Sequence, residues 1–484
     1  MGFMTWQLFR CNGRGANGLD DNCTNPNTTY CISDALIRGQ AQAMFDRGFT
    51  SAGYVTMSID DCYIAGRDPI THILQAFDNP EYPQFPSNSL KSTADFVHSL
   101  GMKLGSYTAE SPNTCCGLMA SQGYEQLDAQ TFASWGVDYL KVDGCNNNYS
   151  YYEIGYPLMG KSLMESGRDT VYSCSWPDYT MSETGGNVTT VDWSSVMNAG
   201  CNQWRVYRDI NCNAADLFDI IDHFGNFAGF MSTIHGPSAW FDPDQLLIGS
   251  GCLTLEEERS QMAIWCILAA PLQVSADFRN MTNSSADILL NKAAIAVNQD
   301  SLGEMGQRIE TSSTAAIQRW VKNLADGRVA VVLLNRHGSP VPCPEWNQNT
   351  SGYLECCGGC CDGFNNLTVP EAEAACCENG EDCAGFSISK EANSLTPGNG
   401  CFKAALNCFQ ESTLYYGYSK VNFPPPTPLP SDILFNFTDA NFGPNESIEV
   451  FDVWSNMIIG TFTSSYMAKN VSFHDNAFLI LRKV

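Results

Sequence analysis

Short apolar runs alternate with amphipathic segments over roughly the first 300 residues. Buried strands are predicted at Gly53–Ile59, Lys103–Tyr107 and Tyr139–Val142, because each run is short and largely apolar. Amphipathic helices are predicted between them at Leu90–Leu100 and Tyr124–Trp135. This alternation is typical of a parallel sheet built from βα units.

The pattern continues through about eight units. A strand is predicted at Thr170–Ser173, and later units end near Arg205–Asp209, Asp242–Asp244 and Leu268–Val274. Eight units favour a (β/α)8 TIM barrel, although a doubly wound α/β sheet is compatible with the same periodicity. In a barrel, the carboxyl ends of all strands lie on one face, where active sites are built. The polar and aromatic residues at or just after these strand ends are Asp60, Asp61, Tyr107, Asp143, Trp176, Asp209 and Asp244.

After about residue 308 the helical pattern gives way to predicted antiparallel strands, among them Ala315–Val321, Arg328–Leu334 and Phe478–Arg482. Ten cysteines crowd into Cys343–Cys408, and a proline-rich connector follows them. The sequence therefore predicts a catalytic barrel over residues 1–307, an antiparallel β-sandwich domain over 308–342 and 422–484, and a disulfide-rich insertion over 343–421.

The composition excludes several classes of protein. A formal net charge of −26 argues against nucleic acids and anionic membranes as partners, since both require basic surfaces. No apolar run reaches the roughly 18 residues that a membrane-spanning helix needs. The 22 cysteines and eleven N-x-S/T sequons together predict disulfides and N-linked glycans, and hence a secreted, cell-surface or lysosome-like location.

The carboxylates at the strand ends are the main candidates for chemistry. Glycoside hydrolysis needs two of them, one acting at the anomeric carbon and one protonating the leaving oxygen. Further carboxylates can accept hydrogen bonds from sugar hydroxyls. Metal binding is the competing use of such residues. The six histidines show no metal-binding spacing and the chain carries no phosphate-binding glycine fingerprint, so neither a metal nor a cofactor is expected.

Several segments carry a resemblance to a known family, in the same order over nearly all of residues 1–310. They are MGFMTWQLFRCN, SIDDCY, KLGSYTAESPNTC, DAQTFASWGVDYLKVDGC, VYSCSWPDY, CNQWRVYRDI, WFDPDQLLIG and QMAIWCILAAPLQVSADFR. The chain resembles glycoside hydrolase family 27, the α-galactosidases and α-N-acetylgalactosaminidases. The resemblance implies a retaining exo-glycosidase that hydrolyses terminal α-D-galactosyl residues of glycans or glycoconjugates.

The resemblance also implies roles for individual residues. Asp143 in LKVDGC matches the nucleophile, and Asp209 in CNQWRVYRDI matches the acid/base. Asp60 and Asp61 match the pair that binds the 4- and 6-hydroxyls of galactose. The other residues that match substrate contacts are Trp6, Tyr107, Lys141, Ser175, Asp178, Tyr179, Arg205 and Asp244.

The cysteines of the barrel match as well. By resemblance the disulfides are Cys11–Cys62, Cys23–Cys31, Cys115–Cys145 and Cys174–Cys201. Cys116, Cys212, Cys252 and Cys266 are left over. An additional bridge between Cys212 and Cys252 is one interpretation, and Cys266 lies in an apolar helix and is expected to be a buried thiol.

Two positions leave the preferred sugar open. The animal α-galactosidases carry Glu and Leu where this chain has Ser175 and Asp178, whereas the N-acetylgalactosaminidases carry Ser and Ala. Ser175 therefore points to N-acetylgalactosamine. Asp178 is charged and larger than Ala, and it could hydrogen-bond a free 2-hydroxyl instead. Galactose is expected first and N-acetylgalactosamine second.

The insertion departs from the family. Its later part is similar to small PAN/apple-like modules, which bind glycans or proteins, so a glycan or protein partner is expected for it. Its C-x₂₋₄-C spacing could indicate zinc, but disulfides are favoured in an oxidising compartment. Alternatives for the whole chain are an endo-acting enzyme on the same barrel and a structural or glycan-binding glycoprotein that kept the fold. A homodimer is compatible with the sequence.

Overall fold

The computed structural model describes residues 1–11, 32–78, 85–310, 316–336 and 430–484, together with the backbone of seven short strands between residues 346 and 420. The chain divides into two compact units. The first comprises Met1–Cys212, Asp216–Asn335 and Asp432–Val484, and the second comprises Asn213–Ala215 and Arg336–Ser431. None of the helices among the described residues is long and apolar enough to cross a membrane.

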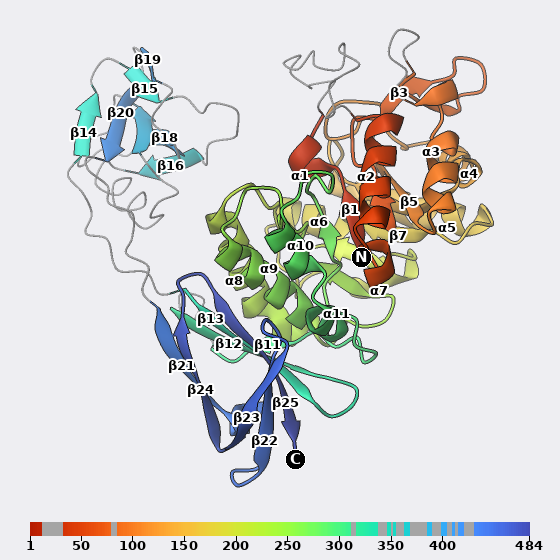
Figure 1. The fold of residues 1–484 in the computed structure, drawn as a ribbon. Helices are drawn as coiled ribbons and strands as arrows, with labels where there is room; N and C mark the ends of the chain where they lie inside the picture. The colour runs from red at the N-terminus through yellow and green to blue at the C-terminus, as the bar shows by residue number, and fades with distance from the viewer. Residues whose placement is uncertain are drawn as a thin grey trace. The chain divides into compact units, whose positions relative to one another are not determined.

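Eight parallel strands form the inner sheet of the first unit, in the order β10-β1-β2-β5-β6-β7-β8-β9. Figure 1 labels β1, β5 and β7 of this sheet. Leu246, just after β9, makes a parallel bridge to Val274 of β10, which brings the two ends of the sheet together. The predicted TIM barrel is confirmed in this part of the chain. Its strands are β1 (Gly2–Met4), β2 (Thr56–Ser58), β5 (Lys103–Ala109), β6 (Val137–Asp143), β7 (Val171–Cys174), β8 (Gln203–Arg205), β9 (Trp240–Asp242) and β10 (Gln273–Val274).

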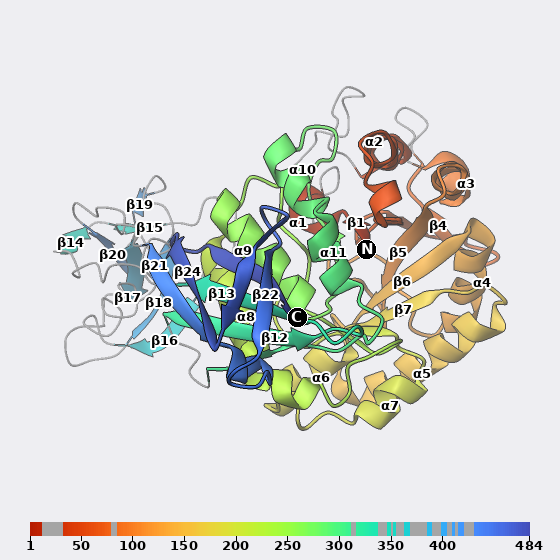
Figure 2. The ribbon, with the colours of Figure 1, turned by 60° about the horizontal axis from the view of Figure 1, so that its bottom comes forward.

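Helices cover the outside of this sheet, and Figure 2 shows α3, α4 and α5 outside strands β5–β7. Local signals fix their ends. Ser33 caps the second helix by accepting from the Leu36 N–H, and Gly136 ends the fourth in the left-handed conformation that glycine tolerates. The barrel helices are α1 (Trp6–Phe9), α2 (Asp34–Asp46), α3 (Lys91–Ser99), α4 (Glu125–Trp135), α5 (Tyr149–Glu165), α6 (Trp176–Thr184), α7 (Trp193–Asn198), α8 (Ala214–Met231), α9 (Leu255–Ile267), α10 (Asn283–Leu289) and α11 (Lys292–Asn298). Shorter elements are η2 (Thr50–Ala52), η3 (Pro86–Asn88) and the hairpin of β3 (Ile64–Arg67) and β4 (Leu74–Ala76).

An antiparallel β domain belongs to the same unit. Its six-stranded sheet has the order β11-β12-β13-β25-β22-β23, and a two-stranded sheet pairs β21 with β24. Apolar side chains from both sheets, such as Val331, Phe435 and Val450, form one buried core. The elements are β11 (Gln307–Arg308), β12 (Ile317–Asn323), β13 (Val329–Asn335), β21 (Ser431–Asn436), η5 (Phe437–Ala440), β22 (Ser447–Asp452), β23 (Met457–Thr463), β24 (Ser465–Val471) and β25 (Asn476–Lys483).

Polar contacts fasten the β domain to the barrel helices. The buried ammonium of Lys322 on β12 donates to the carbonyls of Cys266 (3.1 Å) and Val297 (2.7 Å) at the ends of α9 and α11. Arg259 of α9 makes two hydrogen bonds to Asp475, of 3.0 and 2.7 Å. Because cations and helix carboxyl ends attract each other, Lys322 stabilises both helix ends.

The second unit contains a five-stranded antiparallel sheet in the order β14-β20-β17-β18-β16 and a pair of β15 with β19. The PAN/apple-like assignment and the cysteine pairing of this segment fall largely outside the described residues and stay predictions. Its strands are β14 (Trp346–Asn349), β15 (Gly352–Leu354), β16 (Gly363–Leu367), β17 (Gly385–Ser389), β18 (Gly398–Lys403), β19 (Phe409–Glu411) and β20 (Tyr415–Lys420).

Candidate active site

A pocket of about 130 Å³ opens at the carboxyl ends of the barrel strands. This is the face on which barrel enzymes build their active sites. The pocket is too small for an extended chain of sugars, so it favours a single terminal unit. Its lining consists of Trp6, Asp60, Asp61, Tyr107, Cys115, Lys141, Asp143, Cys145, Ser175, Asp178, Tyr179, Arg205 and Asp209.

One wall is the turn that follows β2. The Asp60 N–H donates to Thr5 Oγ1 (2.9 Å), and Asp60 Oδ1 accepts from the Asp61 N–H (2.8 Å). Asp61 accepts from the N–H groups of Cys62 (2.7 Å) and Cys116 (3.0 Å). Burial raises the pKa of Asp61, and these two N–H bonds oppose that effect. The two carboxylates are therefore held by backbone groups before any substrate arrives.

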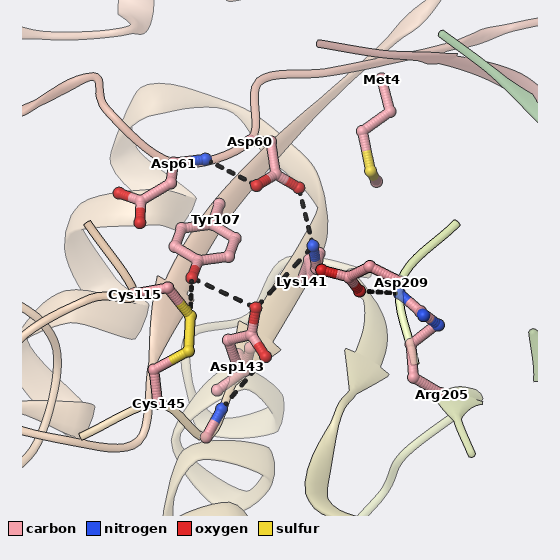
Figure 3. A network of polar contacts seen from close by, with 12 residues as sticks. Met4, Asp60, Asp61, Tyr107, Cys115, Lys141, Asp143, Cys145, Arg205 and Asp209 are labelled. Carbon is pink, nitrogen blue, oxygen red and sulfur yellow. Dashed lines mark hydrogen bonds and ion pairs between the residues drawn. A yellow bond between two sulfur atoms is a disulfide. The ribbon is translucent and has the colours of Figure 1, made fainter. Parts of the chain in front are cut away.

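Lys141 of β6 lies between the carboxylates of the pocket (Figure 3). Its Nζ is 2.9 Å from Asp60 Oδ2 and 3.8 Å from Asp143 Oδ2. Burial disfavours the ammonium, but the negative charges of Asp60, Asp143 and Asp209 outweigh burial and raise the pKa of Lys141. A charged Lys141 in turn lowers the pKa of Asp209.

Asp143 is the last residue of β6, and its side chain is 14% exposed. The hydroxyl of Tyr107 donates to its Oδ2 (3.2 Å), and the Gly144 N–H donates to its Oδ1 (3.2 Å). The Cys115–Cys145 disulfide closes the pocket beside this carboxylate, as Figure 3 shows. Each oxygen of Asp143 therefore accepts a hydrogen bond from the protein, and the carboxyl group still lines the pocket.

Asp209 lies across the pocket from Asp143 (Figure 3), after β8. Its Oδ1 accepts from Arg205 Nη1 (3.0 Å), and its side chain is 62% exposed. Partial desolvation raises the pKa of Asp209, but Arg205 and Lys141 outweigh it and hold the pKa below the usual value. Asp244 stands behind Arg205, at 3.3 Å from the same nitrogen, and burial raises its pKa to about 6.

Ser175, Asp178 and Tyr179 form a third wall at the start of α6. Burial raises the pKa of Asp178 to about 6, while Arg205 opposes the shift. Trp176 points away from this wall and stacks on Tyr156 with a centroid distance of 5.5 Å. The Cys174–Cys201 disulfide ties the end of β7 to the segment before β8. The wall is therefore supported by a stacked ring and a covalent bond.

The structure brings eleven of the twelve sequence-predicted site residues into the pocket lining. The twelfth, Asp244, is 5% exposed and contacts Arg205 from beneath, so it orients a pocket residue and does not line the pocket. Cys115 and Cys145 also line the pocket, although the sequence named them only as a bridge. Because Cys145 lies only two residues after Asp143, its position could have predicted that this disulfide lines the pocket.

The described disulfides are Cys11–Cys62, Cys115–Cys145, Cys174–Cys201 and Cys212–Cys252. Cys23 and Cys31 lie outside the described residues. Cys116 and Cys266 are free thiols in the described part of the chain. Two clusters there have metal-ligand residue types, around Cys62 and around Cys145, but each includes both sulfurs of a disulfide, which are poor ligands.

Comparison with known proteins defines the class. Residues 1–300 match the family model Melibiase_2, described as alpha galactosidase A. The chain belongs to this family, within glycoside hydrolase family 27, and is a glycoside hydrolase.

The alignments with individual relatives cover most of each relative's length. The α-N-acetylgalactosaminidase of Rattus norvegicus is 38% identical over 337 residues, covering 69% of this chain and 76% of the relative. The α-galactosidase A of Homo sapiens is 36% identical over 337 residues, covering 69% and 73%. The crystal structure of α-galactosidase I from Mortierella vinacea superposes with a TM-score of 0.68 at 24% identity, covering 99% of this chain and 96% of that one, and shows the shared fold.

Proposed function

We propose that this protein is a retaining exo-glycosidase that hydrolyses terminal α-D-galactosyl residues. The observation that carries the proposal is a pair of carboxylates, Asp143 and Asp209, on opposite sides of one small pocket with the cation Lys141 between them. Retaining glycosidases need two such carboxyl groups, because one attacks the anomeric carbon while the other protonates the leaving oxygen.

Asp143 is the proposed nucleophile. Tyr107 and Gly144 hold its oxygens, and the Lys141 ammonium lies 3.8 Å away, so the carboxyl group is oriented before the sugar binds. Attack forms a covalent glycosyl–Asp143 ester and releases the aglycone. Water then hydrolyses this ester with inversion at the same carbon, so that the product has the configuration of the substrate.

Asp209 is the proposed acid/base. It must carry a proton when the leaving oxygen departs and must accept one from water in the second step. Its greater exposure suits that exchange, because the proton has to be replaced from solvent in each cycle. Arg205, backed by Asp244, sets the orientation of the carboxyl.

α-N-acetylgalactosaminidase activity is the second candidate. The observation that favours it is Ser175 in the third wall, a small residue in the pocket lining that leaves room beside the sugar. Relatives named α-N-acetylgalactosaminidase and α-galactosidase match this chain about equally well, at 38% and 36% identity. Asp178 favours galactose, because its carboxylate suits a free 2-hydroxyl better than an acetamido methyl.

Kinetics with three leaving groups test the roles of Asp143 and Asp209. Asp143→Asn should abolish turnover of both nitrophenyl and dinitrophenyl α-galactoside, because no ester can form. Asp209→Asn should release dinitrophenolate in a rapid burst while losing most turnover of methyl galactoside, because only the poor leaving group needs a proton. Circular dichroism of both variants checks the fold.

Product stereochemistry gives an independent check. An NMR time course should show α-galactose first, and β-galactose as first product would overturn the retaining mechanism. Full activity in Asp143→Asn would overturn the assignment of the nucleophile.

The surroundings of the enzyme are part of the same proposal. Four disulfides among the described residues support an oxidising, extracellular or lysosome-like compartment, with N-linked glycans on the chain. The glycan substrate is the proposed partner of the pocket. A further glycan or protein partner is proposed for the insertion, and a homodimer remains a prediction.

A further inference from the structure

Glu110 is a buried carboxyl for which the proposed chemistry has no use. It follows β5 directly, its exposed fraction is 0%, and neither of its side-chain oxygens has a hydrogen-bond partner among the described residues. An ionised carboxylate in such a place loses its hydration without compensation, which costs several kcal/mol. The neutral, protonated acid is the form that this environment accepts.

The charges that face Glu110 are negative. Burial first, and then Glu125 and Asp128 of α4, raise the pKa of Glu110 well above its usual value. Asp128 is itself paired with Arg67. Glu125 accepts from the Tyr151 hydroxyl and the Gly123 N–H, so its own charge is satisfied.

The remaining neighbours are uncharged. A Cβ on Gly155 of α5 would lie 2.5 Å from Glu110 Oε2, so the carboxyl rests against the backbone of that helix. The titratable groups that feel its charge from α5 and β7 are the hydroxyls of Tyr151, Tyr156 and Tyr172. These phenols stay neutral at any pH in the working range and offer no compensating positive charge.

The backbone of Glu110 is attached to the strand of the proposed nucleophile. Its N–H donates to the carbonyl of Asp143 (2.8 Å), and its carbonyl accepts from Asn147 Nδ2 (2.6 Å). Five residues later, Cys115 joins Cys145 of the same loop. The segment from Glu110 to Cys115 therefore braces the end of β6 through two hydrogen bonds and one disulfide.

We propose that Glu110 is a positioning residue, whose protonated side chain seats the end of β5 against the Asp143 strand and whose ionisation releases it. The enzyme would then lose the support behind its nucleophile as the pH rises above the acid range. The expected effect of Glu110 on catalysis rests on the proposed role of Asp143. The expected effect of Glu110 on stability does not depend on that role.

The direction of the pH effect follows from linkage. The folded state keeps a proton on Glu110 that the unfolded chain releases near the usual pKa of about 4.3. The stability that this proton contributes is complete below that pH and is lost as the pH rises through the higher pKa of the folded state. Asp61, Asp178, Asp242 and Asp244 also have raised pKa values and add to the same trend, so only a comparison with a Glu110 variant isolates its part.

Glu110→Gln tests the proposal, because glutamine keeps the shape of the neutral acid and cannot ionise. Glu165→Gln is the control, since Glu165 lies on α5, is 52% exposed and undergoes the same change of charge. Thermal midpoints and inactivation half-lives are measured from pH 5 to pH 8, along with the pH profile of kcat/KM. Wild type and Glu165→Gln should lose at least tenfold more half-life over this range than Glu110→Gln, since each unit of pKa difference changes the unfolding equilibrium about tenfold.

At pH 5 the kcat/KM of Glu110→Gln should stay within about twofold of wild type, and its alkaline limb should extend to higher pH. Equal pH dependence of stability in Glu110→Gln and wild type would overturn the proposal.

If Glu110→Gln does not fold, Glu110→Leu provides the same comparison. If neither variant folds, amide hydrogen exchange of the wild type is measured at pH 5 and pH 8 and corrected for intrinsic exchange rates. The protection of residues 108–112 should fall over this range, and constant protection would contradict the proposal. An active Asp143→Asn variant would overturn the proposed function and leave the stability result standing.

Discussion

We propose that Asp178, which lines the pocket beside Ser175, faces the 2-position of the bound sugar. Burial raises its pKa to about 6, so the side chain is largely neutral at acidic pH and can donate as well as accept a hydrogen bond. Either form can pair with a 2-hydroxyl, while its bulk reduces the room that Ser175 leaves for an acetamido group.

Asp178→Ala should therefore shift the preference toward N-acetylgalactosamine. We expect kcat/KM for nitrophenyl α-galactoside to fall about tenfold, the equivalent of one hydrogen bond of about 1–1.5 kcal/mol, and the value for the N-acetylgalactosaminide to rise. Asp178→Asn is the control, because it keeps the size and one hydrogen bond. An unchanged ratio of the two rates in Asp178→Ala would show that this side chain does not face the 2-position.

The proposed acid and nucleophile also set a pH profile. Asp143 must be ionised and Asp209 protonated, and the lowered pKa of Asp209 means that its protonated fraction falls off early as the pH rises. Ionisation of Asp178 near pH 6 adds negative charge nearby and slows that fall. We expect a bell for kcat/KM on the acidic side of neutral, whereas a rate that still rises through pH ~8 would contradict a carboxylic acid donor.

At the level of residues, two sources predicted the pocket lining. Convergence of the barrel strand ends accounts for Asp60, Asp61, Tyr107, Asp143 and Asp209, whereas the family resemblance supplied Trp6, Lys141, Ser175, Asp178, Tyr179 and Arg205. It could not predict that Asp244 lies beneath Arg205, since this depends on a left-handed backbone at Asp244, with φ of 83°. It also gave no sign that Lys322, in a predicted strand region, is buried between two helix ends, because its acceptors are backbone carbonyls far away in the chain.

Helix α9 is the element that joins the barrel to the β domain. Thr254 and Glu257 form a capping box at its start, in which each side chain accepts from the other residue's N–H. Glu257 also contacts His474 Nδ1 (2.7 Å), and Arg259, two residues further along the helix, binds Asp475. The first two turns of α9 therefore cap the start of the helix and hold the loop before β25.

Thr254→Ala should lower the free energy of unfolding by about 1 kcal/mol, the usual cost of a lost N-cap. Thr254→Ser keeps the hydroxyl and should unfold like wild type in a thermal melt. Because no residue that lines the pocket comes from α9, kcat/KM should not change at temperatures below the melting transition. A loss of activity without a loss of stability would indicate that α9 affects the pocket directly.

At the level of elements, the strands and helices whose bounds were predicted lie within a few residues of the observed ones, whereas the two longest helices, α5 and α8, were given no bounds. Predicted Leu90–Leu100 compares with α3 (Lys91–Ser99), and predicted Phe478–Arg482 with β25 (Asn476–Lys483). The first strand, β1, was not predicted from the pattern, because three residues are too few to show a period. Its Gly2 is needed for packing, since a Cβ there would lie 2.1 Å from the Thr56 carbonyl oxygen.

For the whole molecule, the predicted domain boundaries still await an experiment. Excision of residues 343–421, with the flanking strands joined, should leave kcat/KM for nitrophenyl α-galactoside within about twofold. The reason is that the pocket residues all come from the barrel, while the core of the β domain uses strands on both sides of the excised segment, such as β13 and β21. Binding to a glycan array or to a protein partner should be lost.

The comparison of full-length and excised protein is made at equal folded concentration, judged by the melting transition. Retained partner binding together with lost hydrolysis would mean that the insertion serves the pocket. The sequence predicted this segment from its cysteines, its proline-rich connector and its similarity to PAN/apple-like modules, none of which specifies the surface that a partner would bind.

The ionisable lining of the pocket has a consequence for which glycans the enzyme can trim. Two cations face five carboxyl groups, Asp60, Asp61, Asp143, Asp178 and Asp209, and the cations are already paired with carboxylates. A galactose that carries a sulfate or a carboxylate would bring a further negative charge to within a few ångströms of this set, where repulsion is weakly screened. Anionic decoration of terminal galactose would therefore shield a glycan from this hydrolase, so that removal of the anionic group has to come first in any stepwise degradation.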